Sequence, residues 1–418
     1  MSNVTEDTVL PRLRMDLHMT ALEMDGRRVV VVQDPLGLAP GDQAFSLDLL
    51  RLWAGLPEGA TLGDLRDVIQ QHAGEAGVPL DEVAQVLALL DSCHLLDTEA
   101  HARARQAVVD EYMALEARPA IMAGTAYPAD AGELAAWLDA ALDGAAVDGG
   151  EGVHAPVRAV VAPHIDPQVG AACYGAAYAG LRGAVAGRVV ILGVGHSPMD
   201  GLFCFSSKAM DTPLGRVPVD ADAVDRLARA AGDAAVPATQ GDLPHRAEHS
   251  VEFQTLFLQH VLAPGWSVVP VLCGSALSLP DYSRAAFLQG AAAFCAELAD
   301  LLAEPETVCV AGVDFCHIGP KFGHQSPATD LEADARAHET VLLERLAALD
   351  PEGFWAESAR VEDGFNVCGF LAMAALLEAL VLLRERGTDL SCAVLDHAIW
   401  HEEPTQSAVG FAAAAFKG

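Results

Sequence analysis

Residues Val157–His164 read VRAVVAPH, an apolar, strand-like segment that runs directly into a histidine. Arg188–Gly195 leads in the same way into His196, and Val308–Asp314 leads toward His317. In an open α/β sheet, the ligand crevice lies just beyond the carboxyl ends of the strands. Three imidazoles delivered to that edge can converge on one point. The pattern therefore predicts a metal site or an acid–base site.

The chain around these segments alternates strand-like and helical stretches. The expected strands are residues 157–163, 188–194, 267–273 and 307–313, and the expected helices are residues 170–182, 221–231, 249–262, 282–303 and 328–347. This βαβα order predicts an α/β domain over residues 113–418, with a mostly parallel sheet covered by helices on both faces. Two late strand-like segments, Leu390–Trp400 and Ser407–Phe416, are expected to close the sheet.

Residues 1–112 form a predicted second domain of α+β type. Arg27–Gln33 is strand-like, and Leu47–Trp53, Thr61–Gln71 and Leu80–Leu90 show the apolar spacing of short helices. This order is that of a small winged-helix-like domain. The runs from Phe45 to Trp53 and from Leu89 to Leu96 also resemble PqqD-like domains. That resemblance implies peptide recognition, while a structural or dimerising module remains the alternative.

Composition restricts the classes of function. A hydrophobic content of 52% over 418 residues is that of a folded globular protein with a large core. The formal net charge of −33 would repel nucleic acid and anionic membrane surfaces, so neither is an expected partner. The start of the chain lacks the basic and apolar regions of a signal peptide, and no uninterrupted apolar run is long enough to span a bilayer. We therefore expect a cytoplasmic protein.

The nine cysteines do not indicate disulfides or an iron–sulfur cluster. Their number is odd, they are scattered along the chain, and no CxxC spacing is present. Several lie inside apolar strand-like runs, where cysteine behaves as a small hydrophobic residue.

Successive blocks from about residue 118 to residue 416 resemble the Memo family, the bacterial AmmeMemoRadiSam system protein B sequences. The blocks are Arg118–Pro128, the His164 and His196 segments, Ala209–Val219, Glu248–Gln254, Asp314–Gly319 and Cys368-Gly369. Members of this family are similar in fold to class III extradiol dioxygenases, which are non-haem iron enzymes. The order of many blocks makes the resemblance far more specific than any single motif.

The resemblance implies a metal held by His164, His196 and Cys368. Two imidazoles and one anionic ligand leave open positions on Fe(II) for a substrate and dioxygen, so Fe(II) is the expected metal. A thiolate is softer than the usual carboxylate, which keeps Cu or Zn as alternatives. The implied substrate is a small aromatic or chelating molecule.

The same resemblance places Asp314, His317 and His249 in the pocket. His317 is the candidate for proton transfer because its ordinary pKa is near neutral, and Asp314 in the same turn is expected to orient or charge it. The alternative is that the two residues merely hydrogen-bond to each other at the strand end. His249 and Glu252 lie three residues apart on an expected helix and form either a pair that orients a metal ligand or a surface ion pair.

Three other residues are interpreted from their local sequence. Asp166 follows the first ligand, where related sequences have a different pattern, and is expected to add a carboxylate to the pocket. His397 and His401 are four residues apart, which on a helix would be a metal-ligand spacing. Because they lie in a strand-like run, packing or exposure to solvent is the favoured interpretation.

Two functions are consistent with these residues and with the resemblance. The first is a mononuclear, Fe(II)-dependent oxidative enzyme. The second is a metal-binding accessory protein that recruits a radical-SAM partner, with the N-terminal domain docking that partner or a peptide. An enzyme requires an open coordination position and a substrate cavity, whereas an accessory protein requires neither.

Overall fold

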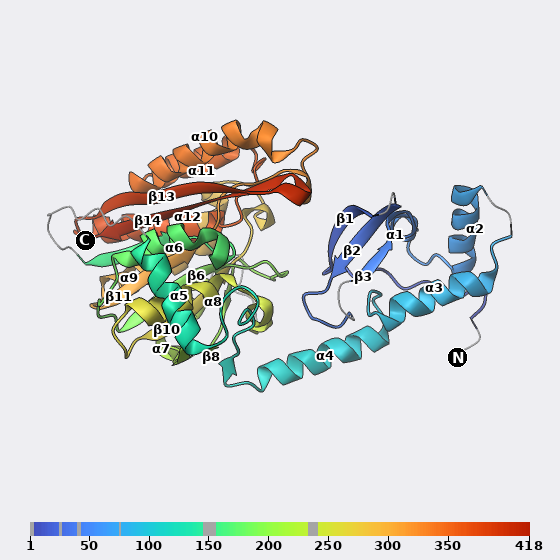
Figure 1. Cartoon of the computed structure of the whole chain (residues 1–418), viewed down its shortest axis with the longest axis horizontal. Helices are drawn as coiled ribbons and strands as arrows, with labels where there is room; N and C mark the ends of the chain where they lie inside the picture. The colour runs from blue at the N-terminus through green and yellow to red at the C-terminus, as the bar shows by residue number, and fades with distance from the viewer. Residues whose placement is uncertain (1–3, 25–26, 40–42, 75–76, 145–155, 233–240) are drawn as a thin grey trace. The chain divides into compact units, whose positions relative to one another are not determined.

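The computed structural model describes residues 4–24, 27–39, 43–74, 77–144, 156–232 and 241–418 (Figure 1). The chain divides into two compact units, Met1–Ala114 and Leu115–Gly418. The sequence pattern predicts a division between residues 112 and 113. Each unit has its own hydrophobic core and is described separately.

A mixed β-sheet forms the centre of the large unit. Its four central strands are parallel, and each begins at the residue expected from the sequence: β5 (Val157–Ala162), β11 (Thr307–Gly312), β6 (Arg188–Val194) and β10 (Ser267–Cys273). The strands follow the order β12, β14, β5, β11, β6, β10, β7, and β13 pairs with β14. The prediction of an α/β fold with a largely parallel sheet is confirmed.

The outer strands of this sheet are antiparallel to their neighbours. They are β7 (Phe203–Phe205), β12 (His317–Ile318), β13 (Ser391–Glu402) and β14 (Ser407–Lys417). The short 3₁₀ helix η4 (Glu403–Thr405) and Gln406, whose φ is +53°, turn the chain from β13 into β14. β14 then pairs with β5, so the expected late strands extend the sheet beside its first strand.

Helices cover both faces of the sheet. Successive strand residues point to opposite faces, so the buried ones belong in turn to one or the other of two hydrophobic cores. In β6, Val190 and Leu192 belong to one core, and Val189 and Ile191 belong to the other. The first face carries α7 (Ala221–Gly232), α9 (Arg284–Ala303), α10 (Ala328–Ala347), α11 (Pro351–Arg360) and α12 (Phe370–Glu385). The second carries α5 (Ala131–Asp143), α6 (Pro167–Ala179) and α8 (Ser250–Val261).

Short elements complete the large unit. A small sheet contains β4 (Ala117–Arg118), β8 (Ala209–Thr212) and β9 (Gly215–Val217). Within the described residues, the unit also has the 3₁₀ helices η1 (Leu243–Ala247), η2 (Ala276–Ser278) and η3 (Pro320–Phe322).

Helix α9 is long and apolar enough to cross a membrane by length and composition alone. However, 56% of its most apolar window is buried, and its buried side chains belong to the core that also contains residues of α7, α12 and β11. In this unit α9 is therefore a core helix.

The N-terminal unit combines a small antiparallel sheet with helices. The sheet contains β1 (His18–Met24), β2 (Arg27–Gln33) and β3 (Gln43–Ser46), and the helices are α1 (Leu47–Ala54), α2 (Leu62–Ala73), α3 (Leu80–Ser92) and α4 (Glu99–Met113). Thr61 and Asp64 form a reciprocal capping box at the start of α2. Leu62 and Leu65 are completely buried, as their helical spacing predicts. The likeness to PqqD-like domains stays a prediction.

Candidate metal centre

Three neighbouring strands of the large sheet end beside one another. His164 follows β5, Asp314 follows β11 and His196 follows β6, and β11 lies between the other two. Because these strands are parallel, their carboxyl ends lie at the same edge of the sheet. The rings of His164 and His196 lie with their centroids 5.1 Å apart. The topology thus brings together two residues that are separated along the chain by a helix and a strand.

Hydrogen bonds show which ring nitrogen of His164 and of His196 is available to bind a metal. Nδ1 of His164 lies 3.0 Å from the carbonyl oxygen of Gly312, and because a carbonyl only accepts, Nδ1 carries the proton. Nδ1 of His196 lies 3.0 Å from a carboxylate oxygen of Glu248. Both contacts leave the lone pair of Nε2 free to bind a metal, and contacts of this kind orient metal-binding histidines.

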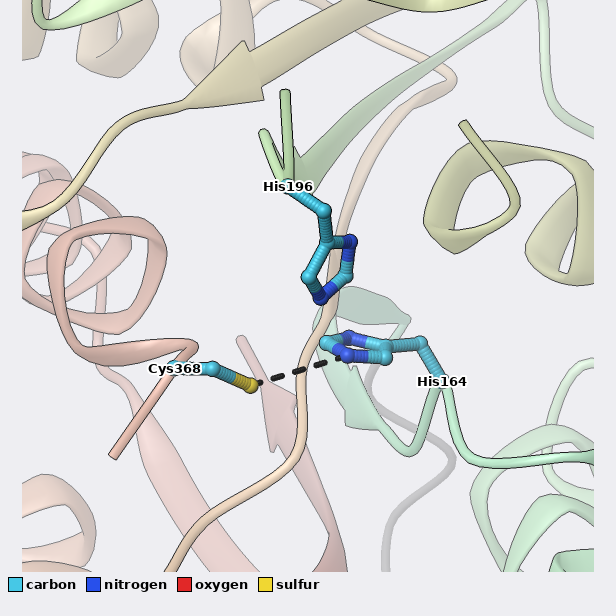
Figure 2. Close-up of side chains that lie close together, drawn as sticks. All are labelled: His164, His196 and Cys368. Atoms are coloured by element: carbon cyan, nitrogen blue, oxygen red, sulfur yellow. Dashed lines mark hydrogen bonds between the residues drawn. The ribbon is translucent and has the colours of Figure 1, made fainter. Parts of the chain in front are cut away.

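Cys368 completes the cluster from the loop that precedes α12. Its Sγ lies 3.6 Å from Nε2 of His164, although the two residues are 204 positions apart (Figure 2). The donor atoms of His164, His196 and Cys368 all lie within 4.8 Å of one another. Gly369 allows the loop to lie against β11, because a Cβ there would come within 2.3 Å of the Cβ of Val313.

Asp314 supports His164. Its side chain is buried, and one oxygen accepts hydrogen bonds from the backbone amides of His164 at 2.9 Å and Ile165 at 3.1 Å. The other oxygen lies 3.6 Å from Nε2 of His164. Within the described residues, these hydrogen bonds of Asp314 hold the turn after β5, and Asp314 acts on His317 through its charge, which acts to raise the pKa of that histidine.

His317 is held by the loop that carries Cys368. Its Nδ1 lies 3.0 Å from the carbonyl oxygen of Phe315 and 3.2 Å from that of Asn366. The side chain of Asn366 donates back to the carbonyl of His317 at 3.1 Å. Burial lowers the pKa of His317, and the charge of Asp314 opposes that shift. No sequence motif marks Asn366, because its role depends on a contact across 49 residues.

His249 is the third imidazole of the cluster. It precedes α8, and its ring stacks on that of His196 with centroids 5.0 Å apart and lies 5.5 Å from the ring of His164. Burial lowers the pKa of His249 to about 4, although the charge of Glu248 acts in the opposite direction. The neutral ring therefore faces the two candidate ligands at neutral pH.

Glu248, rather than the expected Glu252, is the carboxylate of this cluster. The side chain of Glu248 is 3% exposed, and it accepts from the backbone and the ring of His196 and from the amide of Ser250. The donor atoms of Glu248, His196 and His249 also lie within 4.8 Å of one another. Glu252 instead pairs with the buried Arg118. Sequence reasoning missed Glu248, which was named only as the first residue of the block Glu248–Gln254, because its partner His196 lies 52 residues away and is brought near by the fold.

The pKa shifts of the side chains in the cluster are compatible with a bound metal cation. Burial, reinforced by the charge of His196, lowers the pKa of His164 to about 3, so its ring is neutral at pH 7. Burial opposes ionisation of Glu248, but the charge and hydrogen bond of His196 outweigh it and hold the pKa of that carboxyl well below its usual range. Burial, with the charge of Asp314, raises the pKa of Cys368, so a metal must displace the thiol proton. Burial would lower the pKa of His196, but the charge and hydrogen bond of Glu248 outweigh it and raise that pKa. The neutral ring of His164, protons on His196 and Cys368 that a metal can displace, and the nearby carboxylates fit a bound metal ion.

A pocket of about 460 Å³ opens beside the cluster. His196, His317 and Cys368 line one part of it, and the remaining walls are largely apolar. This volume lies within the range of small-molecule sites. The arrangement therefore has both features that a metalloenzyme needs, a set of metal donors and an adjoining cavity.

The remaining sequence candidates lie outside this cluster. Asp166 is exposed and caps α6 by accepting from the amide of Gln168 at 2.8 Å, so the expected pocket carboxylate is a helix cap. His397 and His401 lie on β13 and pair with Glu339 and Glu332 of α10. These contacts agree with the packing interpretation of the two histidines.

The fold and the site together define a class: a mixed α/β protein with a candidate His/His/Cys metal centre at the carboxyl edge of its parallel strands. The model of the Memo-like protein family matches residues 118–415. The chain therefore belongs to the Memo family, as its blocks of sequence predicted.

Similar proteins extend the match beyond the large unit. A MEMO1 family protein of Aquifex aeolicus is 27% identical over 391 residues, which is 92% of this chain and 95% of that protein. One from Thermus thermophilus is 31% identical over 356 residues, covering 84% and 98% of the two chains. Protein MEMO1 of Danio rerio is 25% identical over 290 residues, covering 67% and 90%. The bacterial matches are too long to be confined to the large unit, so they include part of the N-terminal unit.

Proposed function

We propose that the large unit is a mononuclear metalloenzyme that uses His164, His196 and Cys368 as ligands and acts oxidatively on a small aromatic or chelating molecule. The convergence of these three donors beside the 460 Å³ pocket carries the proposal. Fe(II) is the proposed metal, with Cu and Zn as alternatives. When bound, Fe(II) would supply open coordination positions for the substrate and for dioxygen, the oxidant.

The protein groups around the ligands have separate roles in this proposal. Glu248 holds the ring of His196 through Nδ1, and Asp314 holds the backbone of His164. His317 lines the pocket with Nδ1 facing two carbonyls, so Nε2 is the atom proposed to take a proton from the substrate and later return it. His249, neutral and stacked on His196, is proposed to contact the reacting molecule as a third imidazole.

A metal-binding accessory protein is the second candidate, favoured by the separate N-terminal unit. That unit has a hollow of about 290 Å³ whose lining includes Leu10, Met15, Trp53 and Leu56. Met15 is 96% exposed. The lining also includes the ion pair of Arg12 with Glu58. A partly apolar hollow with an exposed methionine suits a peptide or a partner enzyme such as a radical-SAM protein. For such a protein, the metal centre would bind metal without turnover.

Metal analysis of anaerobically purified full-length protein tests the first proposal. We expect about one metal ion per chain, and loss of that ion in His164→Ala and in Cys368→Ser. Cys392→Ser is the matched control, because Cys392 is a half-buried cysteine on β13. Full metal occupancy in Cys368→Ser would refute the ligand assignment.

Oxygen uptake with a panel of catechols then separates the two candidate functions. Consumption of dioxygen that requires the metal and is strongly reduced in His317→Ala supports the enzyme. Stoichiometric metal without turnover favours the accessory protein, and binding of a peptide or partner that is lost in Met15→Ala would assign the N-terminal hollow to that role, because Met15 is exposed whereas Trp53 is part of the core.

A further inference from the structure

Of the described residues, those that line the pocket beside the metal centre include an acidic side chain but no lysine or arginine. Its apolar and aromatic walls include Leu277, Tyr282, Phe322 and Phe370. Among its lining residues, all within the described part of the chain, Asp363 is the one carboxylate, and none is lysine or arginine. A cavity with apolar walls and a single acid admits neutral or cationic molecules and disfavours anions.

Asp363 is held in place by the backbone of its loop. Its φ is +54°, and that of Glu362 is +51°, in the left-handed region that residues other than glycine rarely adopt. One side-chain oxygen accepts from the amide of Val367 at 3.2 Å, and the backbone amide of Asp363 donates to the carbonyl of Ser358 at 3.4 Å. Strained backbone concentrates at functional sites. Here it fixes the carboxylate in the loop that also carries Cys368.

The carboxylate of Asp363 lacks a cationic partner within the described residues, where no ion pair includes it. Burial raises its pKa, and the hydrogen bond from Val367 and the charge of His338 oppose that shift. His338 pairs with a different carboxylate, that of Glu357, from which its Nδ1 lies 2.8 Å away. A half-buried carboxylate without a cation is stabilised by a ligand that brings one.

We propose that Asp363 selects the substrate by charge: the metal centre takes a small aromatic or chelating molecule whose other end carries an amine. This inference rests on the proposed function of the metal centre and adds the substrate's charge and the residue that recognises it. The chelating end lies toward His196 and Cys368, the ring lies between the apolar walls, and the ammonium group pairs with Asp363. A carboxylate at that end would meet an uncompensated negative charge.

Binding of three matched rings to the full-length, zinc-loaded protein tests this inference. Zinc has no redox chemistry, so calorimetry measures affinity without turnover. Dopamine, ethylcatechol and dihydroxyphenylacetate share the chelating ring and differ in the charge of the side chain. We expect dopamine to bind at least about tenfold more tightly than ethylcatechol, and dihydroxyphenylacetate to bind more weakly than either.

The variant Asp363→Asn isolates the charge. Asparagine tolerates the left-handed backbone and keeps an oxygen that can accept from Val367. We expect the affinity for dopamine to fall to that for ethylcatechol, while the affinity for ethylcatechol stays unchanged. Glu362→Gln is the control, because it removes the same charge from the adjacent exposed residue, which does not line the pocket. Metal content and thermal unfolding of both variants verify that the loop is intact.

The outcomes separate the two proposals. Equal affinity for the three rings in the unaltered protein overturns the selection by charge and leaves the metal centre standing. An equal loss of dopamine affinity in Glu362→Gln and Asp363→Asn also overturns it, because the effect would then come from net charge. Failure of all three rings to bind the zinc-loaded protein overturns the proposed aromatic substrate, and the inference with it.

Discussion

The large unit has two buried polar clusters, one with Glu252 of α8 and one with Glu248, two residues before α8, and their chemistry differs. In the first, Arg118 pairs with Glu252 and also donates to the carbonyls of His245 and Glu248. Glu252 in turn accepts from Tyr127 and from the amides of Ile121 and Met122. The charges cancel and the polar atoms are paired, so this cluster joins segments of the fold.

The second cluster also contains a charged pair, His196 with Glu248, but three of its metal-donor atoms converge on one point. His164 and His196 each use Nδ1 for a protein contact, and their Nε2 atoms converge with the sulfur of Cys368. A cluster of this kind can be completed by an ion. Burial and polarity alone therefore do not separate a structural cluster from a metal site. The separating feature is whether the donor and acceptor capacity is used up within the protein.

The largest expected effect is on stability, from breaking the first cluster. Arg118→Met leaves the carboxylate of Glu252 buried without its cation, and we expect a loss of about 3–5 kcal/mol in the free energy of unfolding. Denaturant titration measures it. The control is Arg182→Met, which removes an exposed ion pair with Asp143 and should change stability by about 1 kcal/mol or less. A loss in Arg118→Met no greater than in this control would contradict the structural assignment.

The N-terminal unit contains a third cluster, whose charges are paired within the protein as in the first. Arg14 pairs with Asp16 and Asp34, and Asp34 also accepts from the amides of Leu38 and Ala39. Burial alone would raise the pKa of Asp34, but the hydrogen bond from Arg14 and those from the backbone amides outweigh it and lower the pKa. A lowered carboxyl pKa contributes stability above the unfolded value of about 3.9, and this contribution is lost as the pH falls through the folded value.

We therefore expect Asp34→Asn to destabilise the N-terminal unit by about 1.5–3 kcal/mol at pH 7, and by much less at a pH below the folded pKa of Asp34. Hydrogen exchange of the β2 amides in the full-length protein measures the opening of this unit. A destabilisation of the same size at both pH values would show that the charge of Asp34 is not its source.

A substitution of Glu248, which contacts a candidate ligand but is not one itself, tests the second cluster. Glu248→Gln weakens the hold on Nδ1 of His196 and should lower metal affinity about 10–100-fold. Competition with a chelator measures that affinity. Glu332→Gln is the matched control, because Glu332 also pairs with a histidine, His401, but on β13 and away from the cluster. Equal metal affinity in the two variants would remove Glu248 from the centre.

The smallest effect is expected at Asp166. Asp166→Ala removes the cap of α6 and should cost about 1 kcal/mol of stability, with metal affinity unchanged. Thermal unfolding and chelator competition measure the two quantities. A change in metal affinity without a change in stability would restore the original interpretation of Asp166 as a pocket carboxylate.

The sequence predicted the strands whose own run of apolar residues marks them. The four parallel strands begin at the expected residues, since runs such as Ala159–Ala162 are buried on both faces and are apolar throughout. The short strands β7, β8 and β9 were missed. They have three or four residues each and depend on neighbours for pairing, so no periodicity marks them.

The candidate site was predicted in part. The histidines at the ends of β5 and β6 followed from the strand pattern, whereas Cys368 was reached through family resemblance, because its loop has no metal-binding motif. The hydrogen-bond partners of two carboxylates, Glu252 and Asp314, differ from those expected. Glu252 was paired with His249 by helical spacing, and Asp314 with His317 by proximity in sequence, but tertiary contacts give both carboxylates different partners.

The sequence by itself determined the α/β class, the strands that carry His164 and His196, and membership of the Memo family, because hydrophobic pattern and ordered motifs are properties of neighbouring residues. The tertiary structure decided that β11 lies between β5 and β6, that Cys368 reaches His164 across 204 residues, and which carboxylate serves which ring. Strand order is set by crossover connections and by packing of the helices on the two faces. Those long-range contacts are what turn separate strand-end residues into one site.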